Sequence, residues 1–239
     1  MKYQAHTKTS KGFALIELLT TVAIIGILAT GIQASLGPAT GRARVARIQA
    51  TLANLQTAAA VYSVETGTFA GLCNFTDGTV DESIQRYIDS LVDIAGNDRV
   101  ACIVRTSDVP HGGVHFEPAD QLEGLNFAVS VYYEGRHYAV DMSGVMVLDE
   151  TDIADPVSWE WKEAIAVCAE AGKRLPSIEV LKAINEGGAL GGNQSLLATG
   201  YWSSTGSPTW PDVAYRIRFS NGFIARNLIT SPLRVRCAS

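Results

Sequence analysis

The stretch KGFALIELLTTVAIIGIL, residues 11–28, is apolar along almost its whole length but carries one carboxylate, Glu17. From Phe13 to Leu36 the sequence runs for 24 residues, and Glu17 is the only charged residue among them. A helix of this length spans the roughly 30 Å hydrocarbon core of a bilayer. Because an unpaired carboxylate in that core costs about 3 kcal/mol, we expect Glu17 to have a partner outside its own chain.

The composition predicts one or two folded domains. The chain has 239 residues, of which 47% are apolar and 18% charged, and these values argue against disorder and against a multi-span membrane protein. A net charge of −5 argues against a general nucleic-acid coat. The first 12 residues hold Lys2, Lys8 and Lys11 and no acid, so we expect this segment to stay in the cytoplasm.

Residues 11–19, KGFALIELL, resemble the prepilin cleavage site of type IV pilins and type II secretion pseudopilins. The resemblance implies that a membrane peptidase cuts after Gly12 and methylates the new N-terminus at Phe13. It also gives Glu17 a role, since its carboxylate would lie beside the terminal amine of a neighbouring subunit and fix the register of a filament. Opposite charges in a water-poor core attract by several kcal/mol, which offsets their desolvation.

The same resemblance implies a cell location and partners. The precursor would cross the inner membrane once with its C-terminus outside, and the mature chain would then belong to an extracellular pilus at the cell surface. Its partners would be prepilin peptidase, the inner membrane and other pilin subunits. A surface glycan or another polyanion is a candidate ligand.

An apolar stripe continues the helix beyond the membrane. Apolar residues recur at spacings of three and four at Val45, Ile48, Leu52, Leu55, Ala59 and Tyr62. We therefore predict a pilin helix over residues 13–64, with 13–36 transmembrane and the stripe packed on a globular head. The glycines and proline of residues 37–41 indicate a bend or a locally melted stretch there.

Residues 65–150 have the pattern of an α+β head. A helix is predicted over 80–95, and strands over 126–133, 137–141 and 145–148 form an antiparallel three-stranded meander. An acidic linker over 149–156 then precedes a second module, residues 157–239. In that module we expect helices beginning near Trp161 and at Ile178, the second with Ser177 as its N-cap, and strands at 216–219 and 233–236.

The second module carries the patterns W-x-x-A-x-x-x-C (161–168), R-L-P-S (174–177), Y-W-S-S-T (201–205) and V-R-C (235–237). Together they resemble the bacterial DUF1566 domain, also called the Lcl C-terminal domain, which is related in shape to C-type-lectin-like folds. This resemblance implies a small disulfide-bridged α+β fold with a Cys168–Cys237 bridge, and the module would mediate adhesion.

Four cysteines, an even number, are spaced too widely for a metal knuckle or a CxxC redox pair. Downstream of an export signal they predict two disulfides, and sequence order favours Cys73–Cys102 and Cys168–Cys237. Four buried thiols are the alternative.

Arginines are the candidate ligand residues of the second module. Period-two alternation predicts that Arg216 and Arg218 share one strand face, and that Arg234 and Arg236 share another. Adjacent faces would form a basic patch for a polyanion, whereas pairing with acidic residues is the alternative. Trp202 is a candidate stacking platform in this patch, although a core aromatic is the simpler interpretation.

Other chemistry finds little support in the sequence. Residues 108–117 hold two histidines and two acids in a Gly- and Pro-rich segment, for which we expect an exposed loop and no metal. Nucleophile-elbow and phosphate-loop motifs are missing, so we expect neither an enzyme nor a cofactor. The sequence predicts a minor or tip-type pilin, with a type II secretion pseudopilin and a DNA-uptake pilin that uses the C-terminal arginines as alternatives.

Overall fold

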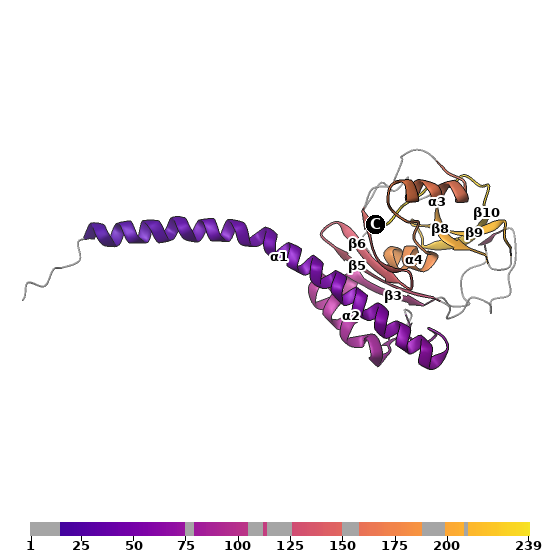
Figure 1. Cartoon of the computed structure of the whole chain (residues 1–239), viewed down its shortest axis with the longest axis horizontal. Coiled ribbons are helices and arrows are strands. Elements are labelled where there is room, and N and C mark those ends of the chain that lie inside the picture. Colours follow the sequence, from indigo (N-terminus) through magenta and orange to yellow (C-terminus); the bar gives the residue numbers. More distant parts are fainter. Residues whose placement is uncertain are drawn as a thin grey trace, which may run out of the picture. The chain divides into compact units, whose positions relative to one another are not determined.

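The computed structural model describes residues 15–74, 79–104, 112–113, 126–149, 158–187, 199–207 and 210–239. The chain divides into two compact units, Met1–Arg44 and Val45–Ser239. Helix α1 (Leu15–Thr66) begins in the first unit and ends in the second, which holds the sheets and the other helices (Figure 1).

Helix α1 confirms the predicted long N-terminal helix. Its backbone stays helical through residues 37–41, so the predicted melted stretch is wrong. The fixed φ of proline is compatible with helical backbone, and the loss of one N–H donor does not end the helix here. The helix ends before Gly67, whose φ of 79° suits a residue without a Cβ and whose N–H donates to the carbonyl of Ser63.

A four-stranded antiparallel sheet forms the centre of the predicted head. Its order is β3-β5-β6-β7, built from β3 (Val100–Val104), β5 (Phe127–Tyr133), β6 (Arg136–Asp141) and β7 (Gly144–Asp149). The last three strands are the predicted meander. Strand β3 was not predicted, because its run of five residues is apolar on both faces and shows no alternation.

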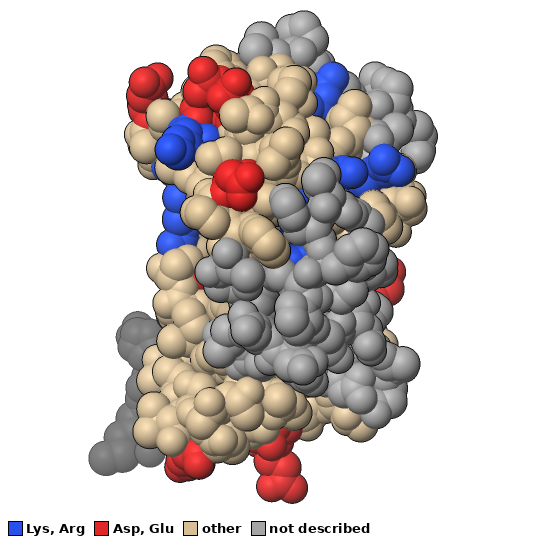
Figure 2. Space-filling model, turned by 90° about the vertical axis from the view of Figure 1, so that its right-hand side faces the viewer, with Lys and Arg blue, Asp and Glu red and all other residues tan. Residues whose placement is uncertain are grey.

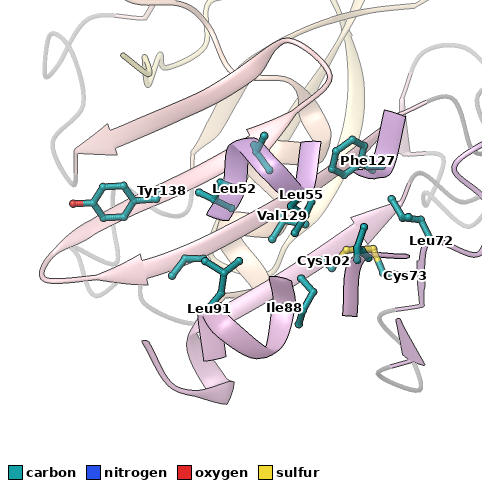
Figure 3. Packing of buried hydrophobic residues seen from close by; sticks show 14 of the residues in the cluster. Leu52, Leu55, Leu72, Cys73, Ile88, Leu91, Cys102, Phe127, Val129 and Tyr138 are labelled. Atoms are coloured by element: carbon teal, nitrogen blue, oxygen red, sulfur yellow. A yellow bond between two sulfur atoms is a disulfide. The ribbon is translucent and has the colours of Figure 1, made fainter. Parts of the chain in front are cut away.

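One face of this sheet packs against the second-unit part of α1 and against helix α2 (Glu82–Ala95) (Figure 3). The predicted stripe provides the contact, since Ile48, Leu52, Leu55 and Ala59 are fully buried and pack with Val129 and its neighbours. The helix predicted over residues 80–95 is therefore confirmed as α2.

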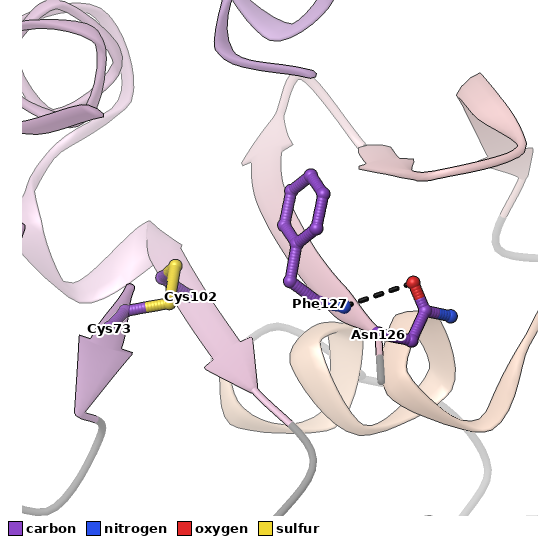
Figure 4. The surroundings of a disulfide bond; sticks show 4 residues. All are labelled: Cys73, Cys102, Asn126 and Phe127. Atoms are coloured by element: carbon purple, nitrogen blue, oxygen red, sulfur yellow. Dashed lines mark hydrogen bonds between the residues drawn. A yellow bond between two sulfur atoms is a disulfide. The ribbon is translucent and has the colours of Figure 1, made fainter. Parts of the chain in front are cut away.

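The predicted Cys73–Cys102 disulfide is present and joins strand β1 (Cys73–Asn74) to β3 (Figure 4). Strand β1 also pairs with β2 (Thr79–Val80), and β2 leads into α2. The bridge thus ties the segment after α1 to the edge of the sheet that α1 covers.

A second four-stranded sheet has the order β4-β10-β9-β8. Its strands are β4 (Gly112–Gly113), β8 (Gly200–Gly206), β9 (Val213–Arg218) and β10 (Phe223–Leu228). Strand β4 comes from the predicted head region and pairs in parallel with β10. Sequence analysis predicted neither of these two strands. The strand predicted at 233–236 is wrong, because Leu233 and Arg234 make isolated bridges only.

Helix α4 (Ile178–Glu186) lies between the two sheets (Figure 1). It contacts β3, β5 and β6 on one side and β8 and β9 on the other. Ser177 caps it as predicted, accepting a hydrogen bond from the N–H of Val180. A second core therefore combines residues of both sheets around α4, and the predicted head and the predicted second module share one compact unit.

A third core lies on the other face of the second sheet. It gathers Trp202 and Ala214 with helix α3 (Trp161–Glu170) and the C-terminal segment. The predicted Cys168–Cys237 disulfide joins α3 to this segment. The chain end then reaches the first sheet, where Ser239 and Val147 exchange two backbone hydrogen bonds.

Candidate functional site

A cavity of about 340 Å³ opens on the face of the second sheet that carries Trp202. Arg216 and Arg218 of β9 line it, together with Asn227 of β10 and Arg234 of the C-terminal segment. Two residues apart on one strand, Arg216 and Arg218 point to the same face, as the sequence predicted. The cavity thus collects three of the four arginines proposed for the ligand patch.

Arg216 is held in place by its neighbours on both sides. Its Nε donates to Asn227 Oδ1 over 2.7 Å, which joins β9 to β10. On the other side lies Gly200 of β8, where a Cβ would come within 2.9 Å of Arg216 Cδ and 3.0 Å of Nη1. The missing side chain of Gly200 therefore makes room for the guanidinium at the cavity.

Three guanidiniums line this cavity, and two of them, those of Arg216 and Arg218, are neighbours on β9. Burial, followed by the charge of Arg218, lowers the pKa of Arg216. The Nε of Arg218 is buried and has no hydrogen-bond partner among the described residues. None of the nine residues lining the cavity, all of them described, is acidic. A bound anion would neutralise the two guanidiniums and supply oxygen acceptors for their N–H groups.

Arg236 and Trp202, the other two predicted patch residues, lie away from the cavity. The Arg236 side chain is 7% exposed, and its guanidinium lies 5.6 Å from the ring centroid of Phe219. Arg234 and Arg236 do not share one face because the backbone there forms isolated bridges instead of a regular strand. Trp202 is fully buried and donates from Nε1 to the carbonyl of Trp159, so the core interpretation holds and its ring is not on the surface.

Charges on the visible face of the molecule are mixed. Figure 2 shows Lys and Arg in blue at several separate places, some of them beside Asp and Glu in red. Among the described residues on this face, the basic groups do not form one continuous surface. The cavity, whose described lining holds three arginines and no acid, is a local concentration of positive charge.

The N-terminal candidates are only partly described. Gly12 and Phe13 lie outside the described residues. Glu17 is exposed in the first turn of α1, and its carboxylate has no ion-pair partner within the described part of the chain. Around it, apolar side chains of the same helix are more than half exposed, among them Ile16, Leu18, Leu19, Val22 and Ile25.

The described residues also bear on membrane and metal binding. Within these parts of the chain, no helix combines the length and the apolar character that crossing a bilayer requires. The predicted span over 13–36 lies partly outside them. The two histidines and two acids of segment 108–117 are likewise outside. Elsewhere in the described ranges, no three His, Cys, Asp or Glu side chains cluster as a metal site would require.

Comparison with protein families finds one match, in which residues 7–32 fit the Prokaryotic N-terminal methylation motif. The motif supports a type IV pilin-like or pseudopilin-type protein, a structural class with processing and filament assembly. Searches of curated proteins and of solved structures gave no match. The match covers the residues that carry the first resemblance, whereas the lectin-like resemblance of the C-terminal residues has no support from these comparisons.

Six of the nine lining residues were not predicted from the sequence, and Gly200 and Asn227 are the two of them that position Arg216. Gly200 precedes the Y-W-S-S-T pattern of residues 201–205, and its role depends on the side chain of Arg216 in another strand. Asn227 belongs to β10, which was not predicted at all. That Gly200 lies beside an arginine of β9 can be recognised only when the pairing register of β8 and β9 is known.

Proposed function

We propose that this chain is a structural subunit of a type IV pilus, of the minor or tip type, made as a membrane-anchored precursor. The observation that carries the proposal is the methylation motif at residues 7–32. Cleavage after Gly12 would leave Phe13 as the methylated N-terminus of the mature subunit. A structural role also agrees with the class of protein to which this motif points.

The exposed apolar side chains of α1 support assembly with other chains. Ile16, Ile25 and Ile27 are 71%, 64% and 72% exposed in the isolated chain. Apolar surface of this kind gains about 25 cal/mol for each Å² removed from water, and large exposed patches mark interaction sites. Packing of α1 among the helices of other subunits would bury these side chains.

Glu17 fits the same assembly. Its exposed carboxylate, without an ion-pair partner in the described part of the chain, is available to the terminal amine of a neighbouring subunit. In the packed interior of a filament this ion pair would satisfy both charges. A subunit placed out of register would leave them unpaired, so the pair would also select the axial position.

The residues beyond α1 would be displayed on the filament, where the arginine cavity suggests adhesion. A type II secretion pseudopilin is the first alternative, since the motif is common to both classes. A DNA-uptake pilin is the second, because guanidiniums bind phosphate. Steeply salt-dependent binding to DNA would favour this second alternative.

Co-expression with a prepilin peptidase tests the proposal. Mass spectrometry should find a mature chain that begins at Phe13 and carries one added methyl group. A Gly12→Val variant should stay uncut, and a Glu17→Ala variant should be cut normally but fail to enter filaments. An unprocessed wild-type chain, or filaments that accept Glu17→Ala as well as wild type, would contradict it.

A further inference from the structure

We propose that the cavity between β8, β9 and the C-terminal segment binds the carboxylate of an acidic saccharide unit, such as a uronic acid. This inference names the ligand class of the adhesive role proposed above and rests on that role. It depends on Arg216 and Arg218, which lie side by side on β9, and on Gly200, which leaves space for the guanidinium of Arg216.

The size of the cavity sets the size of the ligand. About 340 Å³ lies near the lower end of the range of roughly 300–1,000 Å³ that small-molecule sites occupy. One sugar ring with its substituents suits this volume better than a longer chain. The cavity would therefore hold a single unit of a glycan, with the rest of the chain extending into solvent.

The charges select an anion. The Nε of Arg218 is buried without a partner among the described residues, and Arg216 uses its own Nε on Asn227. An oxyanion in the cavity would receive N–H donors from the outer nitrogens of Arg216 and Arg218. A planar guanidinium pairs with a planar carboxylate through two parallel hydrogen bonds, which a spherical cation such as an ammonium cannot make.

The remaining lining suits a sugar ring. Ser158 and Asn227 bring hydroxyl and amide groups, whereas Leu233 and Pro232 provide apolar surface. A saccharide carries hydroxyl groups at its edge and C–H groups on its faces, so it matches a lining of both kinds.

An extended polyanion fits the described surface less well. Proteins that hold DNA through its backbone make several phosphate contacts along a strand. The basic groups on the face shown in Figure 2 are separated and interspersed with acids. A cavity of about 340 Å³ lined by Arg216, Arg218 and Arg234 is better suited to one charged group than to a row of phosphates.

Calorimetric titration of the full chain in detergent tests the inference. The probes are glucuronate, glucose, inorganic sulfate and a single-stranded oligonucleotide, each at low and at high salt. Glucuronate and glucose differ in one group, a carboxylate in place of a hydroxymethyl. We expect saturable glucuronate binding at least about tenfold tighter than glucose binding, as one charge-assisted hydrogen-bonded contact predicts.

Variants locate the site. Arg218→Gln should weaken glucuronate binding at least about tenfold, and Arg86→Gln, which removes the same charge from an exposed position on α2, should leave it unchanged. Gly200→Ala keeps every charge but places a methyl group against Arg216, so it should also weaken binding. Gly26→Ala is its control, because a Cβ there meets nothing within 4 Å. If Arg218→Gln lowers the melting temperature, Arg218→Lys replaces it and should still bind more weakly, because it lacks the planar fork.

Several results would overturn the inference. Glucuronate binding no tighter than glucose binding would show that the cavity does not recognise the carboxylate. Glucuronate binding that survives both Arg218→Gln and Gly200→Ala would show that the site lies elsewhere. Tighter binding to the oligonucleotide with a steep salt dependence would favour DNA uptake. Peptidase processing and filament assembly are measured separately, so a failed titration leaves the structural role of the subunit intact.

Discussion

The two faces of the sheet β3-β5-β6-β7 are buried by different kinds of contact. The face toward α1 and α2 is apolar, with Leu52, Leu55 and Val129 among its fully buried side chains. The opposite face, toward α4, mixes apolar residues with buried polar ones, including Ser130, His137 and Asp141. Two of these groups are joined to α4 and its cap, since Ser130 Oγ donates to the carbonyl of Ala183 and Asp141 Oδ2 accepts from the hydroxyl of Ser177. The ring nitrogens of His137 are buried without a hydrogen-bond partner among the described residues.

The difference shows what each face requires of its neighbour. An apolar face accepts any complementary apolar surface, and its stability grows with the area buried. A face with buried polar groups favours a partner that satisfies most of them, since an unsatisfied buried group costs about 1–3 kcal/mol. The second face therefore specifies how the C-terminal residues dock, and the first supplies much of the apolar burial.

The largest effect is expected on the apolar face. Leu52→Ala should lower the free energy of unfolding by about 2–5 kcal/mol, through lost burial and the cavity left behind. Chemical denaturation of the full chain in detergent measures it. Val64→Ala is the control, since Val64 is 84% exposed, and it should change stability by less than about 0.5 kcal/mol. Equal losses in the two variants would show that the stripe is not a core.

The polar face should respond to pH. Burial, followed by the charge of Arg236, lowers the pKa of His137 to about 4 from its ordinary 6.5. Between these values the unfolded chain binds a proton that the folded chain excludes, so stability falls as pH drops from 6.5 to 4. The total loss is about 3 kcal/mol. Above pH 6.5 the contribution of His137 to stability does not change with pH.

Denaturation at pH 7, 5.5 and 4 measures that loss. His137→Phe should remove this part of the pH dependence, whereas Leu52→Ala, on the other face, should lower stability but keep it. A wild-type chain equally stable at pH 7 and pH 4, after correction for acidic groups, would contradict the assignment.

A smaller loss is expected at Asp141, which is 2% exposed. Its Oδ1 accepts from the N–H of Ser143, and its Oδ2 accepts from the hydroxyl of Ser177, the cap of α4. Asp141→Ala leaves these donors without their acceptor and should cost about 2 kcal/mol. Hydrogen exchange should show the loss concentrated in α4. An unchanged α4 would show that docking does not depend on this carboxylate.

The smallest effect concerns Asp81 at the start of α2. Its Oδ1 accepts from the N–H of Ser83, and its hydrogen bonds to Ser83 lower its pKa. Asp81→Ala should cost about 1 kcal/mol by thermal denaturation at pH 7. The contribution is present above the ordinary pKa of 3.8 and disappears as pH falls through the lower folded value. Asp93→Ala, an exposed change in the last turn of the same helix, should be neutral.

Features with a local cause were predictable. The stripe of α1, the helix α2, the meander and the Ser177 cap all follow from residues close together in sequence, whose periodicity or capping chemistry is legible without the fold. Both disulfides were also paired correctly from sequence order, because each closes within one region of the chain.

Features that depend on residues far apart in the sequence could not be predicted. Strand β4 joins β10 across more than a hundred residues, and no local pattern marks Gly112–Gly113 as a strand. The four arginines of the predicted patch do not all lie together, for a similar reason. Arg216 and Arg218 stay together because one strand fixes them, whereas Arg234 and Arg236 lie outside regular strands and follow different neighbours.

The sequence by itself therefore determined the N-terminal motif, the long helix with its apolar stripe, and the local elements of the C-terminal half. Tertiary structure alone decided that α4 lies between two sheets, that Trp202 is buried, and that Gly200 opens space beside Arg216. The physical reason is the distance along the chain over which each interaction acts. Helix periodicity and caps act over a few residues, whereas a shared core and a charged cavity arise from side chains that only the complete fold brings into contact.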